Sequence, residues 1–154
     1  MVLALVALIL GPSCAPASHP ATLRVIEVKD GDTIVVEGGQ RVRYIGIDAP
    51  EIYPKVEPLG IEAWQANRAL VEGKIVRLEE DVSDKDKYGR LLRYVYVDHT
   101  CVNVELVKRG LACVYPESWF PDNKYYHQLK QAETEAKDEG RGLWENKIFR
   151  QERQ

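Results

Sequence analysis

The residues best suited to chemistry lie in one short stretch, 30–51, which reads DGDTIVVEGGQRVRYIGIDAPE. Apolar residues alternate with polar ones on both sides of the segment 37–40, which predicts two antiparallel strands joined by a tight glycine turn. Asp32 enters the first strand and Asp48 leaves the second, so both carboxylates are expected at the open end of this hairpin. Arg43 lies between them in sequence. Carboxylates gathered beside a guanidinium suit a divalent cation and a phosphate.

Asp32 and Asp48 are hard oxygen donors, and no thiol or imidazole lies near them in the sequence. Such a site prefers Ca²⁺ or Mg²⁺ to zinc. Backbone carbonyls and waters would have to complete the coordination, which favours Ca²⁺ because Mg²⁺ requires a more regular octahedron. The alternative is that Asp30 and Asp32 only form an Asx turn before the strand, as Asp-Gly pairs often do.

Five further side chains could act on a phosphodiester. The guanidinium groups of Arg43 and Arg90 can hold a phosphate and stabilise a pentacoordinate transition state. Glu51 could take the proton of a water molecule. Lys87 and Tyr88, in a charged loop, could bind a phosphate and a base. Each residue also has a simpler interpretation, as a solvated strand arginine, an exposed loop glutamate or a polar loop tip.

A chain of 154 residues is long enough for one domain with a proper core and hardly for two. Its net charge of −3 argues against coating nucleic acid through bulk positive charge, but it allows a local basic cleft. Hydrophobic periodicity predicts strands over 22–29, on either side of 37–40, and over 74–79 and 91–97, with an extended segment at 111–115. It predicts helices over 60–72 and 102–109, and from Asp122 or Asn123 to Glu139, after which Leu143 and Trp144 fold back onto the core. This pattern favours an α+β, mainly β fold: a five-stranded OB-type barrel with three helices.

The positions of Arg43 and Asp48 pose a geometrical problem. On a regular strand two residues of opposite parity face opposite sides, so both side chains could not reach one phosphate. We therefore predict a kink or bulge between them, at Gly46.

The amino terminus has the apolar run 2–10 and no Lys, Arg, Asp or Glu before Arg24. The run is too short to span a bilayer and is typical of an export signal, so a secreted or cell-surface location is expected. Lipid attachment at Cys14 and a cytoplasmic tail are the alternatives. Cys101 and Cys113 could pair after export, or remain buried thiols.

Three motifs occur in one order: DGDT, then R-x4-DAPE, then DKYGR. With the Gly-Leu-Ala sequence at 110–112 and the Gly-Leu-Trp sequence at 142–144, this order resembles the staphylococcal nuclease (thermonuclease) family over residues 23–146. The resemblance implies an OB-fold barrel with three helices. It divides the chain into a leader and linker at 1–22, a nuclease-like domain at 23–147 and a tail at 148–154.

The resemblance also implies roles for the site residues. Asp32, Asp48 and the main-chain carbonyl of Ala49 would be the Ca²⁺ ligands. Arg43 and Arg90 would bind phosphate, and Glu51 would activate water. Nucleotide contacts would fall to the residues that match the family's base- and phosphate-binding positions: Lys87, Tyr88 and Tyr115.

The implied activity is Ca²⁺-dependent endonucleolytic hydrolysis of DNA and RNA, with little sequence specificity, preference for single strands and release of 3′-phosphates. A monomer without a dedicated protein partner is expected, with possible membrane attachment through the leader. One alternative is a catalytically silent OB-fold module that binds nucleic acid, but all five site side chains that such decay would remove are present: Asp32, Arg43, Asp48, Glu51 and Arg90. Another is an exported domain that uses Ca²⁺ only for stability.

Overall fold

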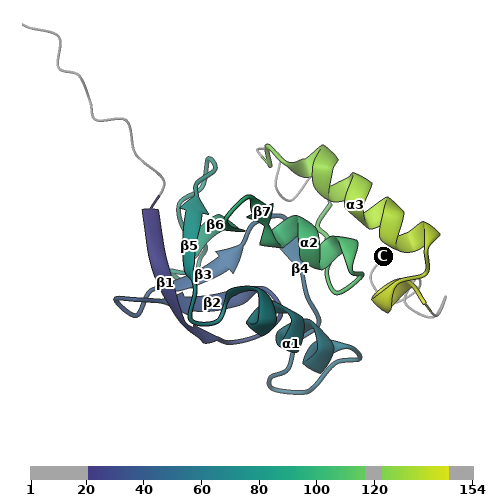
Figure 1. The fold of residues 1–154 in the computed structure, drawn as a ribbon, viewed down its shortest axis with the longest axis horizontal. Coiled ribbons are helices and arrows are strands. Elements are labelled where there is room, and N and C mark those ends of the chain that lie inside the picture. The colour runs from purple at the N-terminus through teal and green to yellow at the C-terminus, as the bar shows by residue number, and fades with distance from the viewer. Residues whose placement is uncertain (1–20, 117–122, 146–154) are drawn as a thin grey trace, which may run out of the picture.

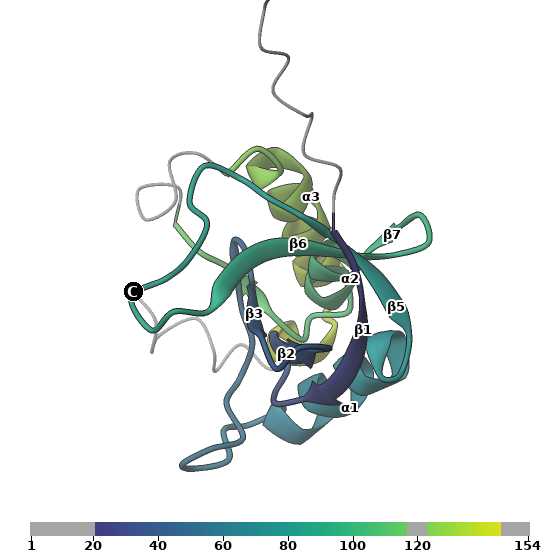
Figure 2. The same ribbon diagram turned by 90° about the vertical axis from the view of Figure 1, so that its left-hand side faces the viewer.

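The computed structural model describes residues 21–116 and 123–145. Five strands form a barrel in these ranges (Figure 1). They are β1 (Ala21–Val28), β2 (Thr33–Val36), β3 (Arg41–Tyr44), β5 (Ile75–Glu79) and β6 (Leu91–Val97). Antiparallel pairing gives the order β3-β2-β1-β5-β6, and a parallel pairing of β3 with β6 closes the barrel (Figure 2). The predicted α+β barrel with three helices is confirmed.

Three helices cover the barrel, and a 3₁₀ turn follows them. They are α1 (Gly60–Val71), α2 (Val102–Lys108) and α3 (Tyr126–Asp138), with the turn at Gly142–Trp144. Figure 1 shows α2 between the barrel and α3. The helix predictions are confirmed except for the start of α3. The Asn123 side chain does not cap that helix, because it accepts a hydrogen bond from the Tyr94 hydroxyl. Asp122 lies outside the described residues.

Three two-residue strands complete the structure: β4 (Ile47–Asp48), β7 (Thr100–Cys101) and β8 (Cys113–Val114). β7 pairs with β6, whereas β4 and β8 form a separate antiparallel sheet. β8 lies within the extended segment predicted at 111–115. β4 and β7 were not predicted, since two residues carry no measurable alternation.

A single main core joins the barrel interior to the helices. The residues of α2 and α3 that face it include Leu106, Val107 and Leu129, each fully buried. Asn103 on α2 is also fully buried, yet its polar groups are used. It accepts a hydrogen bond from Val95 N (3.0 Å) and donates one to the Ile45 carbonyl (3.0 Å). Because a buried amide without partners is costly, these bonds fix α2 against the end of β3.

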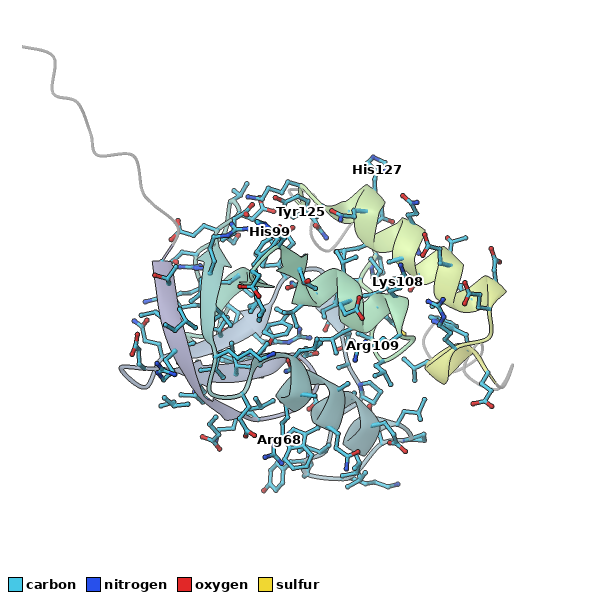
Figure 3. The ribbon with its side chains drawn as sticks, viewed as in Figure 1. Arg68, His99, Lys108, Arg109, Tyr125 and His127 are labelled. Carbon is cyan, nitrogen blue, oxygen red and sulfur yellow. The ribbon has the colours of Figure 1, made fainter. Side chains whose placement is uncertain are left out.

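The structure also bears on several smaller predictions. Leu143 packs into the core, as predicted. No disulfide joins Cys101 to Cys113. His99 lies between β6 and β7 and His127 on α3, where its side chain projects outward (Figure 3). The apolar amino-terminal run and Cys14 lie outside the described residues. Within 21–116 and 123–145, no helix has the length and apolar character needed to cross a bilayer.

Glu79 on β5 makes the fold sensitive to acid. Its carboxylate meets Arg77, Lys124 and Tyr125, each at 2.7 Å. Burial alone would raise the pKa of Glu79, but these partners outweigh it and lower the pKa to about 2. The carboxylate therefore stabilises the fold above its unfolded pKa of about 4.3. This contribution is lost as the pH falls toward 2.

Glu79→Gln is expected to reduce the free energy of unfolding at pH 7 and to flatten its decline between about pH 4.5 and pH 2. Denaturant titrations at several pH values measure this slope. Glu62→Gln, at an exposed position on α1, is the control. If the free energy of unfolding fell with the same slope against pH in the wild type and in Glu79→Gln, the lowered pKa of Glu79 would be contradicted.

Candidate active site

The turn before β2 buries one carboxylate and uses a second to hold the backbone. Asp30 Oδ1 accepts a hydrogen bond from Asp32 N at 3.0 Å, so the Asx turn given above as the alternative interpretation is present. Asp32, only 2% exposed, points inward, and its Oδ2 accepts a hydrogen bond from Ala49 N at 2.7 Å. Gly31 between them is packed tightly, because an added Cβ would lie 2.5 Å from the Ala49 Cβ. The turn therefore joins the start of β2 directly to the end of β4.

Arg43 on β3 lies at the centre of the site and is 8% exposed. Its Nη1 donates hydrogen bonds to the carbonyl oxygens of Tyr44 (2.9 Å) and Ile47 (2.7 Å). Its Nη2 lies 3.1 Å from Asp32 Oδ2 and 3.2 Å from Asp48 Oδ1. The two carbonyls fix the guanidinium plane, so Nη2 is directed at both carboxylates.

The predicted distortion between Arg43 and Asp48 is confirmed. β3 ends at Tyr44, and Gly46 adopts φ +77°, a conformation that favours glycine. The chain then leaves the barrel as β4, which pairs with β8 instead of continuing beside β2. This break brings Asp48 to the same side as Arg43.

β8 brings Tyr115 to the site. The Tyr115 hydroxyl donates to Asp48 Oδ1 at 3.1 Å and accepts a hydrogen bond from Arg43 Nη2 at 3.4 Å. Burial, together with Asp48, raises the pKa of Tyr115 to about 12, so the hydroxyl keeps its proton at neutral pH. Tyr115, which the resemblance places among the nucleotide-contacting residues, thus lies against a predicted metal ligand.

α3 holds β8 in place through a buried glutamate. Glu133 Oε1 accepts a hydrogen bond from Val114 N at 3.0 Å, and Oε2 meets Lys130 and Lys137. Burial would raise the pKa of Glu133, but the two lysines outweigh it and lower the pKa. The ionised carboxylate therefore connects α3 to the strand that leads into Tyr115.

The site carries more negative than positive charge. Burial raises the pKa of Asp32 to about 7; Arg43 opposes this shift, whereas Asp30 and Asp48 add to it. Among the described residues, no group of three or more His, Cys, Asp or Glu side chains could by itself hold a metal ion. Two carboxylates and a nearby backbone carbonyl are hard oxygen donors, and a divalent cation would offset their excess charge. The donor set therefore fits Ca²⁺.

Glu51 lies at the edge of this group and is solvent-exposed. Partial burial raises its pKa; Asp30 and Asp48 add to the shift, and Arg43 opposes it. Its backbone is fixed by Glu57, whose Oε2 accepts from Glu51 N (3.1 Å) and whose N donates to the Glu51 carbonyl (2.9 Å). A carboxylate with a raised pKa on a fixed backbone suits proton transfer from water.

Arg90, Lys87 and Tyr88 form a second group. Asp86 holds Arg90 through its side chain at 2.6 Å and also accepts a hydrogen bond from Tyr88 N (2.9 Å). Lys87 Nζ lies 5.1 Å from the centre of the Tyr88 ring. The parallel register pairs Arg43 with Leu92 on β6, and Arg90 lies one residue before that strand.

The fold and the site geometry agree with a known family. A family model described as staphylococcal nuclease homologue matches residues 41–146. The chain belongs to the staphylococcal nuclease family. A thermonuclease of Staphylococcus hyicus is 38% identical over 135 residues, which cover 84% of this chain and 79% of that protein. A thermonuclease of Staphylococcus intermedius is 42% identical over 129 residues, which cover 79% and 74%. The SPbeta prophage-derived endonuclease YokF of Bacillus subtilis is 44% identical over 122 residues, which cover 75% of this chain and 41% of that longer protein.

This member of the staphylococcal nuclease family also uses residues that sequence reasoning missed. Arg93, 6% exposed on β6, clamps the loop that carries Arg90. It donates to Asp84 Oδ1 (2.6 Å) and to the Asp84 carbonyl (3.0 Å). Asn67 links the Tyr44 hydroxyl (2.8 Å) to the Asp30 carbonyl (3.0 Å). An arginine inside the apolar run LLRYVYV was a visible signal, whereas Asn67 and Glu133 gave none because their partners are distant in sequence.

Proposed function

We propose that this chain is a Ca²⁺-dependent endonuclease that hydrolyses phosphodiester bonds of DNA and RNA, with little sequence specificity, and leaves 3′-phosphates. The observation that carries the proposal is the break at Gly46, which places Arg43 Nη2 between Asp32 and Asp48. The two carboxylates proposed to hold a cation and the guanidinium proposed to bind phosphate are thereby adjacent. Membership of a family whose relatives are named thermonuclease and endonuclease supports the same conclusion.

Each proposed site residue would have its own role in the hydrolysis. Asp32, Asp48 and the Ala49 carbonyl would hold Ca²⁺, which supplies positive charge beside the phosphate. Glu51 takes a proton from a water molecule as the water oxygen bonds to phosphorus. The bond from phosphorus to the 5′ oxygen breaks, its electron pair leaves with that oxygen, and the oxygen takes a proton from solvent.

Charge accumulates on the phosphate oxygens during this step. Arg43 would donate Nη2–H to these oxygens in exchange for its contacts with Asp32 and Asp48, while Nη1 stays bonded to two backbone carbonyls and keeps the guanidinium in place. Arg90, held by Asp86 at 2.6 Å, would bind the same phosphate, and Lys87, Tyr88 and Tyr115 would contact the nucleotide. Phosphate contacts carry no base information, so sequence preference is weak. Splayed single strands suit an open barrel face better than a duplex.

The test is digestion of denatured DNA and of RNA by the purified chain, in Ca²⁺ and in chelator. Calcium-dependent cleavage that Glu51→Gln abolishes and exposed Glu62→Gln retains is the expected result. Binding without cleavage would instead favour a silent nucleic-acid-binding module.

Ca²⁺ is also expected to raise the melting temperature of the wild type, because a cation offsets the repulsion between Asp32 and Asp48. Asp32→Asn should lose this shift. Equal melting curves in Ca²⁺ and in chelator would contradict the proposed metal site.

We propose in addition that the protein is exported, since the run 2–10 has the length and composition of an export signal. Detection of the processed protein outside the cells that make it tests this location.

A further inference from the structure

The loop between β4 and α1 presents an aromatic side chain to solvent. Tyr53 is 81% exposed, more than any other large hydrophobic residue in the described ranges. Lys55, two residues later, is also exposed. Burial in the core is the usual fate of a large apolar surface, so this loop leaves an aromatic face and an ammonium group available to a ligand.

Hydrogen bonds between backbone and side-chain groups join the two ends of this loop. Glu57 bonds to both the N–H and the carbonyl of Glu51, and Gly60 N donates to the Glu57 carbonyl at 2.9 Å. Gly60 also lies so near Glu51 that an added Cβ would meet the Glu51 carbonyl at 2.5 Å. Pro54, next to Tyr53, restricts the backbone of the loop tip. Tyr53 is therefore presented on a constrained loop, which lowers the entropy lost when it binds a ligand.

The loop tip is also close to the proposed site. Ala49 N is bonded to Asp32, and Tyr53 follows Ala49 by four residues, a span of at most about 14 Å even for a fully extended chain. Glu51, the proposed base, lies between them.

A second loop shows the same combination of side chains. Lys87 and the 65% exposed Tyr88 lie together in the segment 81–90, which Arg93 and Asp86 hold at its base. Figure 2 shows the 51–59 and 81–90 segments extending on the same side of the barrel. Each loop offers an aromatic ring with a lysine near it in sequence, and these are groups that hold single-stranded nucleic acid.

We propose that Tyr53 and Lys55 form a nucleotide subsite: Tyr53 stacks on one base of a single-stranded substrate and Lys55 contacts the adjoining phosphate. The substrate strand then runs from this subsite past Glu51 and Arg43 to the loop of Lys87 and Tyr88. The inference rests on the proposed nuclease function and adds a base-binding position to it. A stacking platform accepts every base, so it raises affinity without imposing sequence specificity.

The experiment compares wild type, Tyr53→Ala, Tyr53→Phe and Tyr53→Leu in the full chain. Steady-state cleavage of a single-stranded oligonucleotide in Ca²⁺ is measured together with its binding by fluorescence anisotropy. Loss of one stacked base corresponds to a roughly tenfold weakening. Tyr53→Ala and Tyr53→Leu are therefore expected to raise KM and Kd about tenfold with little change in kcat, whereas Tyr53→Phe keeps the ring and wild-type values. Ile75→Ala, at a 59% exposed position on β5 and outside both loops, is the control.

The outcomes separate this proposal from the proposed function. Cleavage by wild type with unchanged KM and Kd in Tyr53→Ala would overturn the subsite and leave the nuclease intact. Absence of cleavage by wild type, with oligonucleotide binding weakened by Tyr53→Ala, would overturn the nuclease and leave the subsite. A chain that neither cleaves nor binds the oligonucleotide would overturn both. Equal weakening in Tyr53→Phe and Tyr53→Ala would exclude ring stacking.

Discussion

Replacement of Arg43 by lysine is expected to lower kcat on single-stranded DNA by about two to three orders of magnitude. The guanidinium donates to two backbone carbonyls through Nη1 while Nη2 faces the acidic pair. A lysine ammonium is a compact charge on a flexible stem and cannot keep the planar geometry that fixes these donors together. Initial rates at saturating Ca²⁺ and substrate measure the loss.

Arg41→Lys is the matched control, because Arg41 is an exposed arginine two positions earlier on the same strand. It should retain wild-type turnover. Melting temperatures of both variants separate a catalytic effect from unfolding. If Arg43→Lys kept more than about one-tenth of the wild-type kcat, Nη2 could not be a principal donor to the transition state.

The second large effect is expected for Gly46→Ala, which should lower the free energy of unfolding by about 2–4 kcal/mol. Two costs combine at this position. The left-handed conformation of Gly46 strains any residue with a Cβ. That Cβ would also press on the Asn123 side chain and lie 2.8 Å from Leu129 Cδ1. Because Gly46 redirects the chain toward Asp48, the remaining folded protein should also bind Ca²⁺ more weakly.

Gly38→Ala separates these two costs. Gly38 has φ +85° at the tip of the β2–β3 hairpin, where an added Cβ would meet nothing within 4 Å. Only the conformational cost of about 1 kcal/mol should therefore appear. Equal destabilisation by the two substitutions in chemical denaturation would show that packing around Gly46 is unimportant.

Features of the site that depend on residues close together in the sequence could be predicted from the sequence. The hairpin follows from alternation around a glycine turn, and both carboxylates come to its open end as expected. The break at Gly46 followed from parity, since Arg43 and Asp48 could not otherwise share a face. These predictions succeeded because strand geometry fixes side-chain direction over a few residues.

The remaining geometry depends on pairings between distant segments. The contact of Tyr115 with Asp48 requires the β4–β8 sheet, and closure of the barrel requires the parallel register of β3 with β6. Neither register is encoded in a local pattern. The expected cap at Asn123 was wrong for the same reason, because Tyr94, distant in sequence, uses the Asn123 side chain. The proposed roles of the site residues remain predictions.

The hydrogen bond from Val114 N to Glu133 joins β8 to a helix that is synthesised later, so it bears on the order in which the site is assembled. A chain synthesised only as far as Tyr115 already contains every proposed site residue. It lacks α3, and therefore the carboxylate that holds the strand leading into Tyr115. A nascent chain on the ribosome thus cannot complete this arrangement until α3 has emerged. The last part of the site's framework to be synthesised is therefore remote in sequence from the residues that it supports.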